Sequence, residues 1–78
     1  MSTSEKENKV KIENFIKKFR QYNKLTQEKL AQKSRVSTRA MQNYERGERL
    51  PDVQTVQRIA QALDVTVDDL YPMQRLAQ

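Results

Sequence analysis

Hydroxyl, guanidinium and amide side chains gather on one face of residues 38–46. Wound as a helix at about 100° per residue, this segment places the following side chains within an arc of about 140°: Thr38, Arg39, Gln42, Asn43 and Arg46. Their donors and acceptors match nucleic-acid base edges, because guanidinium groups pair with guanine and side-chain amides pair with adenine. The pattern indicates a DNA-reading helix, although an ordinary solvated helix face can have the same composition.

The opposite side of this expected helix is apolar. Ala40, Met41 and Tyr44 fall there and would pack against a core. Ser37 supplies a hydroxyl that can cap the first turn, and Gly47 supplies a residue that readily adopts the left-handed conformation that ends helices. The polar face is therefore expected to point outward from a helix with defined ends.

The rest of the chain must position this helix, and its patterns also predict helices. Apolar residues recur at helical spacing, and Thr26, Asp52 and Thr66 are suitable N-caps, the last with Asp69 as a capping-box partner. No segment shows the alternation of a strand, so the predicted fold class is all-α with five helices. The expected helices cover about residues 10–22, 27–33, 38–45, 53–63 and 67–71.

Composition narrows the function further. The 78 residues form one small domain and include no His and no Cys, which excludes Cys–His zinc sites, thiol nucleophiles, Ser–His–Asp triads and disulfides. No cofactor, metal, small-molecule ligand, membrane span or enzymatic activity is expected, and the chain is expected in the cytoplasm. Residues 1–50 hold thirteen basic and six acidic side chains, a balance of +7, whereas residues 51–78 have a balance of −2. This asymmetry favours a polyanionic partner, nucleic acid or anionic membrane, unless it serves only solubility.

The segment Leu25 to Gly47, LTQEKLAQKSRVSTRAMQNYERG, resembles the Xre/Cro/C1-repressor family of helix-turn-helix proteins. The likeness rests on the run from Leu25 to Glu28, on Leu30-Ala31 and on Tyr44 with Glu45-x-Gly47, and it extends over about residues 12–71. The resemblance implies a compact five-helix domain of lambda-repressor-like type, in which the second and third helices form the helix-turn-helix. Residues 1–9 would be a disordered arm, 10–72 the DNA-binding domain and 73–78 a C-terminal tail.

The same resemblance assigns roles to individual side chains. The second helix would lie across the DNA backbone and the third would enter the major groove. The implied base readers are Thr38, Arg39 and Asn43, with Gln42 as a weaker candidate, and the implied phosphate contacts are Gln27, Ser37, Arg46 and Arg49. Simpler alternatives stay open: Ser37 as a cap alone, Gln27 as a first-turn residue, and both arginines as solvated side chains.

Two structural expectations follow from the family pattern. Arg20 and Glu45 occupy the positions of a partly buried ion pair. Lys24, Arg35 and Asp64 stand where the family often has glycine, and a left-handed non-glycine residue costs roughly 1–2 kcal/mol. One hypothesis is that Arg35 is tolerated because its charge lies near DNA.

Members of this family commonly form dimers, so the partners expected are double-stranded DNA and a second copy of the chain. The candidate dimer residues are Val67, Leu70, Tyr71, Met73 and Leu76, although these could instead close the core, which is the favoured role for Leu70. The expected function is a sequence-specific transcriptional regulator, a repressor that excludes polymerase from a promoter. The rival is a protein-interaction module on the same fold, an antitoxin or a coactivator-type bridge, using the fifth helix and the tail.

Overall fold

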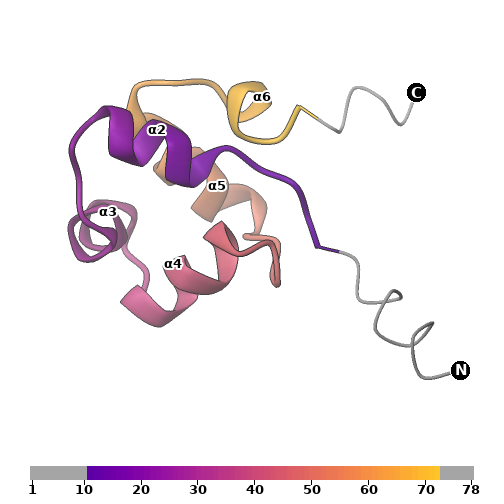
Figure 1. Ribbon diagram of the computed structural model, residues 1–78, viewed down its shortest axis with the longest axis horizontal. Helices are drawn as coiled ribbons and strands as arrows, with labels where there is room; N and C mark the ends of the chain where they lie inside the picture. Colours follow the sequence, from indigo (N-terminus) through magenta and orange to yellow (C-terminus); the bar gives the residue numbers. More distant parts are fainter. Residues whose placement is uncertain (1–10, 73–78) are drawn as a thin grey trace, which may run out of the picture.

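The structure, a computed structural model, describes residues 11–72. In this range the chain forms helices joined by short turns, and no strand occurs among these residues (Figure 1). The predicted all-α class with five helices is therefore confirmed. The helices are α2 (Ile16–Tyr22), α3 (Gln27–Ser34), α4 (Thr38–Glu45), α5 (Val53–Leu63) and α6 (Val67–Leu70).

Side-chain caps define where four of these helices begin, as the sequence predicts. In each case a hydroxyl or carboxylate oxygen accepts the backbone N–H three residues later, which satisfies a donor that has no partner within the helix. Thr66 and Asp69 form the complete capping box, each side chain accepting from the backbone of the other residue. The cap and donor pairs are Thr26–Lys29 at 3.0 Å, Ser37–Ala40 at 3.0 Å, Asp52–Thr55 at 2.8 Å and Thr66–Asp69 at 3.1 Å.

Within residues 11–72 the first helix, α2, begins at Ile16, later than the start near residue 10 that the sequence predicts. The preceding N-terminal segment, residues 11–15, is not helical because its amide groups bond to distant carbonyl groups. The N–H of Ile12 donates to the Gly47 carbonyl at 2.8 Å, and the N–H of Phe15 donates to the Leu70 carbonyl at 3.0 Å. These long-range bonds outweigh the helical periodicity of the sequence.

Position 47 requires glycine for two reasons, its left-handed backbone conformation and the close approach of Ile12. Its φ is +76°, the left-handed conformation predicted for the residue that ends α4. A Cβ atom at this position would lie 2.5 Å from the carbonyl oxygen of Ile12. Any other residue would therefore push the N-terminal segment away from the α4–α5 loop.

The residues that replace family glycines are left-handed too. Lys24, Arg35 and Asp64 have φ angles of 58°, 61° and 60°. Arg35 ends α3 and Asp64 ends α5, and each donates its backbone N–H to helical carbonyl groups. The sequence correctly located these three left-handed positions, and each retains a Cβ where glycine would relieve strain.

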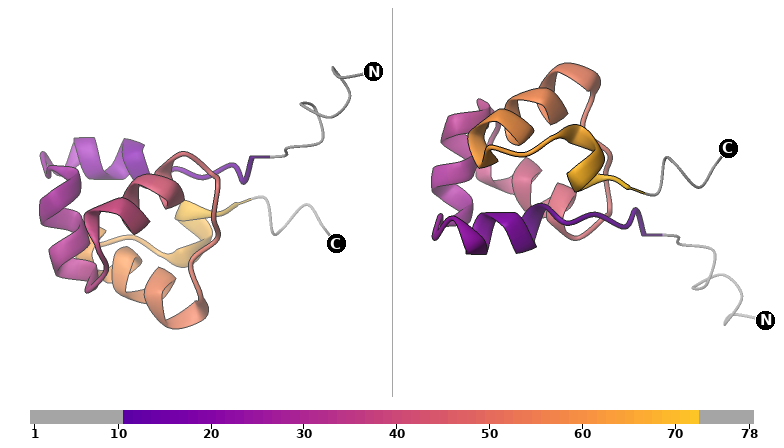
Figure 2. Two further views of the ribbon diagram at one scale, coloured as in Figure 1. Left: turned by 90° about the horizontal axis from the view of Figure 1, so that it is seen from below. Right: turned by 90° about the horizontal axis from the view of Figure 1, so that it is seen from above.

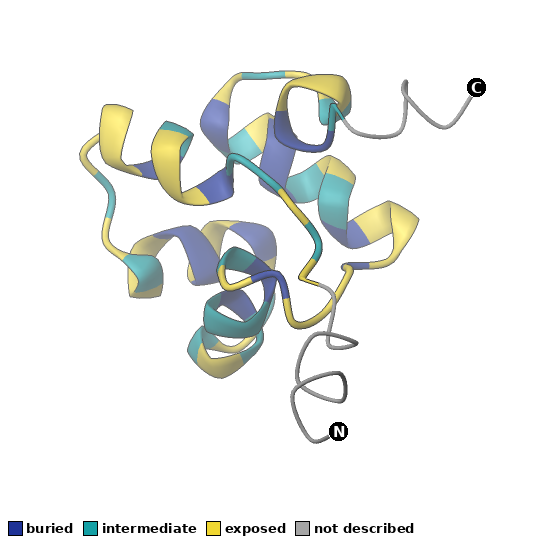
Figure 3. Cartoon of the chain, turned by 45° about the vertical axis from the view of Figure 1, so that its right-hand side comes forward, coloured by how far each residue is buried: buried dark blue, intermediate teal, exposed yellow. Residues whose placement is uncertain are grey.

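The core lies between α3 and its neighbours α4 and α5, with α2 and α6 completing the domain (Figure 2). The buried faces of the helices point into this centre, and the outer faces are exposed (Figure 3). None of the helices in the described range has the length and apolar character needed to span a membrane. The largest fully buried apolar side chains are Ile16, Leu30, Met41, Ile59, Leu63 and Leu70.

The end of the described chain corrects part of the dimer prediction. Leu70 is 0% exposed and Tyr71 is 3% exposed, so both side chains close the core and neither lies on the surface. Val67 packs against the same core and is partly buried, while Met73 and Leu76 lie outside the described residues. Burial raises the pKa of the Tyr71 hydroxyl to about 12, and that hydroxyl has no hydrogen-bond partner among residues 11–72.

Candidate nucleic-acid interface

Helix α4 has the two faces that its sequence predicts. Met41 and Tyr44 are buried in the core, and Arg39 is exposed on the other side. Thr38, Gln42 and Asn43 are partly exposed. The Ser37 hydroxyl accepts the Ala40 N–H and so serves as the cap of the helix.

A hollow of about 450 Å³ lies where α2, the first turn of α3 and α4 meet. Three residues expected to contact DNA line it together: Gln27 from α3, Gln42 from α4 and Arg46 just after α4. The hollow is also lined by Glu45 and Lys17. The structure therefore brings an expected base reader and two expected phosphate contacts to one surface, built from two different helices and the loop.

Lys17 is a member of this surface that the sequence analysis did not assign. It is exposed on α2 and carries a positive charge to the edge of the hollow. A signal was present, because Lys17 lies three residues before Arg20 and residues at that spacing share one side of a helix. Arg20 contacts Glu45, which lines the same hollow, so that side of α2 faces α4.

The expected ion pair between Arg20 and Glu45 is present, and it lies beneath the hollow that Glu45 lines. The Arg20 Nε donates to Glu45 Oε2 at 2.5 Å and its Nη2 donates to Oε1 at 3.1 Å, a bidentate arrangement. The third guanidinium nitrogen, Nη1, donates to the Leu25 carbonyl at 2.9 Å. The two side chains are only 10% and 3% exposed.

Glu45 also fixes the orientation of Gln27. The Gln27 Nε2 donates to Glu45 Oε1 at 2.9 Å. One carboxylate therefore binds side chains from α2 and from α3 while it belongs to α4. This network sets the relative position of the first turn of α3 and the exposed face of α4, a contact that sequence reasoning missed.

Arg46 and Asn43 contact each other at the C-terminal end of α4. The Arg46 Nη2 donates to Asn43 Oδ1 at 3.0 Å, and its Nε donates to Glu48 Oε1 at 3.4 Å. Because Arg46 and Glu48 are both about half exposed, their ion pair contributes little to stability. A bidentate contact of Asn43 with adenine uses its Oδ1 and Nδ2 atoms, and Oδ1 has a second lone pair that can accept from the base while Arg46 stays bound.

Arg49 does not line the hollow. It is exposed in the loop before α5, and its charge reaches Asp52, the N-cap of that helix. The pKa of Asp52 lies below its ordinary value of 3.8 mainly because Thr55 hydrogen-bonds to the carboxylate, with smaller effects from the positive charges of Arg58 and Arg49. Arg49 therefore extends the positive surface toward the start of α5.

The sequence and fold of this chain match those of known proteins. A family model described as helix-turn-helix, HTH_3, matches residues 16–70. The chain belongs to this helix-turn-helix family. Its helix-turn-helix resembles that of the HTH-type transcriptional regulator YqaE of Bacillus subtilis (strain 168), itself described as uncharacterized, with 42% identity over 55 residues. The match covers 70% of this chain and 47% of YqaE, so the chain spans about half the length of this relative.

Solved structures show the same fold. The clp gene regulator ClgR from Corynebacterium glutamicum matches with a TM-score of 0.66 and 30% identity, over 69% of this chain and 57% of that one. The restriction-modification controller protein C.AhdI from Aeromonas hydrophila also matches with a TM-score of 0.66, at 28% identity, over 69% of this chain and 82% of that one. The resemblance to Xre/Cro/C1-type proteins of lambda-repressor-like fold is confirmed.

Proposed function

We propose that this chain is a sequence-specific, double-stranded-DNA-binding transcriptional regulator that places α4 in the major groove. The observation that carries this proposal is the shared surface on which Gln27, Gln42 and Arg46 line one hollow beside the exposed Arg39. The names of YqaE and ClgR as regulators support the same function. We place the chain in the cytoplasm, where such a regulator meets DNA, and assign it no catalytic role.

The dimensions and chemistry of α4 suit this role. A helix is about 10–12 Å wide with its side chains, and the major groove of B-DNA is about 12 Å wide. Arg39 would bind guanine, and Thr38, Gln42 and Asn43 would contact neighbouring bases. The phosphate contacts would come from Gln27, Ser37, Arg46 and Arg49, with Lys17 added from the structure.

We further propose that the protein acts as a homodimer and represses by occupying a promoter. One recognition helix reads only a few base pairs, and two-fold related helices about 34 Å apart read successive major grooves. The burial of Leu70 and Tyr71 leaves Val67 as the partly exposed candidate for the dimer contact within residues 11–72, together with Met73 and Leu76 beyond them.

Selection of binding sites from a random duplex pool, with excess competitor DNA at physiological salt, tests the proposal. An enriched inverted repeat with half-sites about one helical turn apart supports a sequence-reading dimer. A single half-site would retain the DNA function and remove the dimer. No enrichment by the folded protein would overturn the proposal and favour the protein-interaction module.

Point variants then separate the roles of individual side chains. Arg39→Ala should reduce the binding free energy for the selected site by roughly 1–3 kcal/mol and relax the base preference at one base pair. Arg49→Ala should weaken binding to all DNA sequences alike, and the slope of the log binding constant against log salt concentration should decrease by about one. Lys29→Ala is the matched control, because this exposed lysine lies about 200° around α3 from Gln27 and its loss removes the same charge. Equal losses for Arg39→Ala on selected and random DNA would contradict its role as a base reader.

A further inference from the structure

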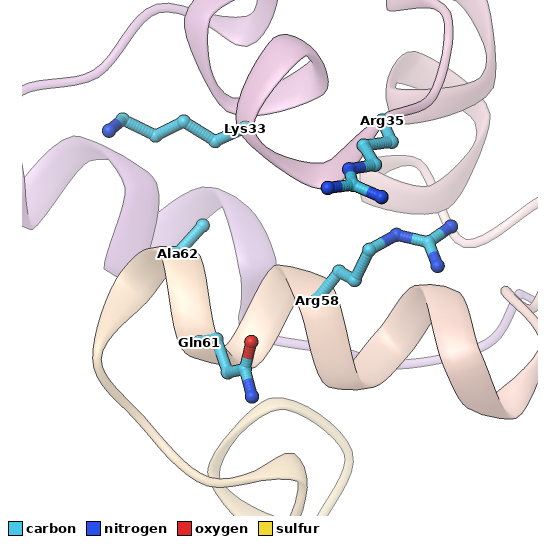
Figure 4. Close-up of a pocket in the computed structure, with 5 residues that line it drawn as sticks. All are labelled: Lys33, Arg35, Arg58, Gln61 and Ala62. Atoms are coloured by element: carbon cyan, nitrogen blue, oxygen red, sulfur yellow. The ribbon is translucent and has the colours of Figure 1, made fainter.

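A second hollow lies between the C-terminal end of α3 and α5, and its charged residues are all basic. Its volume is about 450 Å³, and its lining residues are Lys33, Arg35, Arg58, Gln61 and Ala62. Arg35 and Arg58 extend from the two sides into the gap between the helices, and the Ala62 side chain points into the same gap (Figure 4). Lys33 also lines the hollow, although its side chain extends away from the two arginines, and no acidic side chain of residues 11–72 lines it.

The cations of this hollow are not neutralised within the described part of the chain. The salt bridges among residues 11–72 are Arg20–Glu45 and Arg46–Glu48, so Lys33, Arg35 and Arg58 form none there. Arg58 is held in place by neutral groups, since its Nε donates to the Ser34 carbonyl at 2.9 Å and its Nη2 to Thr55 Oγ1 at 3.3 Å. The positive charge of Arg58 lowers the pKa of Asp52 slightly. The Asp52 carboxylate, however, accepts a hydrogen bond from the Thr55 N–H and forms no salt bridge with Arg58 among residues 11–72.

This hollow is separate from the candidate DNA surface. Gln27 and Lys33 are six residues apart in α3, which places them about 9 Å apart along the helix axis and about 120° apart around it. The DNA surface is built from α2, the start of α3 and α4, and the second hollow is built from the end of α3 and α5. Arg35 lies two residues before Ser37, in the turn that leads into α4, so the DNA backbone is the alternative source of phosphate that the experiments below must distinguish.

We propose that the hollow between α3 and α5 binds the phosphate group of a small phosphate monoester. The guanidinium groups of Arg35 and Arg58 reach it from the two helices, and a guanidinium matches the geometry of phosphate oxygens with paired donors. A phosphate monoester carries a charge of about −1.5 to −2 at pH 7, so it neutralises more of this positive charge than a single carboxylate does.

The probe for this site is inorganic phosphate, titrated into the ¹⁵N-labelled full chain at constant ionic strength with chloride as the exchanged anion. We expect saturable chemical-shift changes at residues 33–35 and 58–62. Arg35→Gly should weaken phosphate binding about tenfold or more, since hydrogen bonds to charged groups contribute at least that factor.

Lys24→Gly is the matched control for Arg35→Gly. Both substitutions place glycine at a left-handed position, with φ of 58° and 61°, and both remove one positive charge. Lys24 does not line the hollow, so Lys24→Gly should leave the phosphate affinity unchanged. Shifts that do not saturate, or that respond equally to both variants, would overturn the proposal.

A second measurement distinguishes a free phosphate ester from the DNA backbone as the source of the phosphate. If the hollow serves a small molecule, Arg35→Gly leaves the salt dependence of DNA binding equal to that of Lys24→Gly. A salt slope lower by about one for Arg35→Gly alone would show a DNA phosphate contact and overturn the proposal. The phosphate titration needs no DNA, so its outcome is independent of the proposed regulatory function.

Discussion

Replacing Glu45 by alanine should destabilise the domain by about 3–5 kcal/mol, the usual cost of removing one partner of a buried ion pair. The carboxylate accepts two hydrogen bonds from Arg20 and one from Gln27, and the Arg20 side chain left behind is only 10% exposed. Its guanidinium would keep the single bond to the Leu25 carbonyl. A chain of 78 residues has a total stability of roughly 4–12 kcal/mol, so this one change removes a large part of it.

Urea denaturation followed by far-ultraviolet circular dichroism measures the loss. Glu48→Ala is the matched control, because Glu48 also pairs with an arginine but lies about half exposed, and its removal should cost less than about 1 kcal/mol. The Arg20→Met/Glu45→Met double variant should be more stable than the two single losses predict together, since no unpaired charge remains. If Glu45→Ala is no more destabilising than Glu48→Ala, the ion pair does not hold the helices together and the reasoning is wrong.

Three further predictions concern single positions. Gly47→Ala should lower the melting temperature in thermal unfolding, because its φ is +76° and the new Cβ would lie 2.5 Å from the Ile12 carbonyl oxygen; an unchanged melting temperature would show that the N-terminal segment yields freely. Asp52→Asn keeps a capping side chain but removes the charge. The pKa of Asp52 is lowered in the folded state, so the stability that its charge adds is present above pH 3.8 and is lost as the pH falls through the folded pKa. The free energies of unfolding of the wild type and of the variant should therefore become similar at acid pH. Tyr71→Phe removes a buried hydroxyl that has no hydrogen-bond partner within residues 11–72, so urea denaturation should show equal or greater stability, and a loss of stability would indicate a hydrogen bond to that hydroxyl.

Local chemistry made most of the fold predictable. Thr26, Ser37, Asp52 and Thr66 cap the helices that follow them because a short oxygen-bearing side chain satisfies a nearby N–H group, and this requires no knowledge of distant residues. The start of the first helix was wrong for the opposite reason. The N–H groups of the N-terminal segment bond to the α4–α5 loop and to α6, and no local pattern reports such partners.

In the candidate site too, features set by local sequence were predictable and features set by helix packing were not. Helical spacing alone identified the exposed face of α4, because a helix fixes which residues share a side. The Gln27–Glu45 hydrogen bond, the place of Lys17 beside Gln42 and the approach of Arg35 to α5 depend on how helices pack, so the sequence did not predict them. Tyr71 was wrongly expected on the surface because a residue just beyond a short helix gives no periodic signal of burial.

The hydrogen bond between Phe15 and Leu70 has a consequence for how the chain could be reconnected. It places the start of the first helix beside the end of the last one, and Figures 1 and 2 show both ends of the described chain leaving on one side. Chain ends that lie close together tolerate circular permutation. A linker could therefore join residues 72 and 11, with new termini opened in the exposed loop at residues 48–50. Such a permutant would keep helices α2 to α6, yet place the chain ends beside α4, where a fused reporter would sense the approach of DNA.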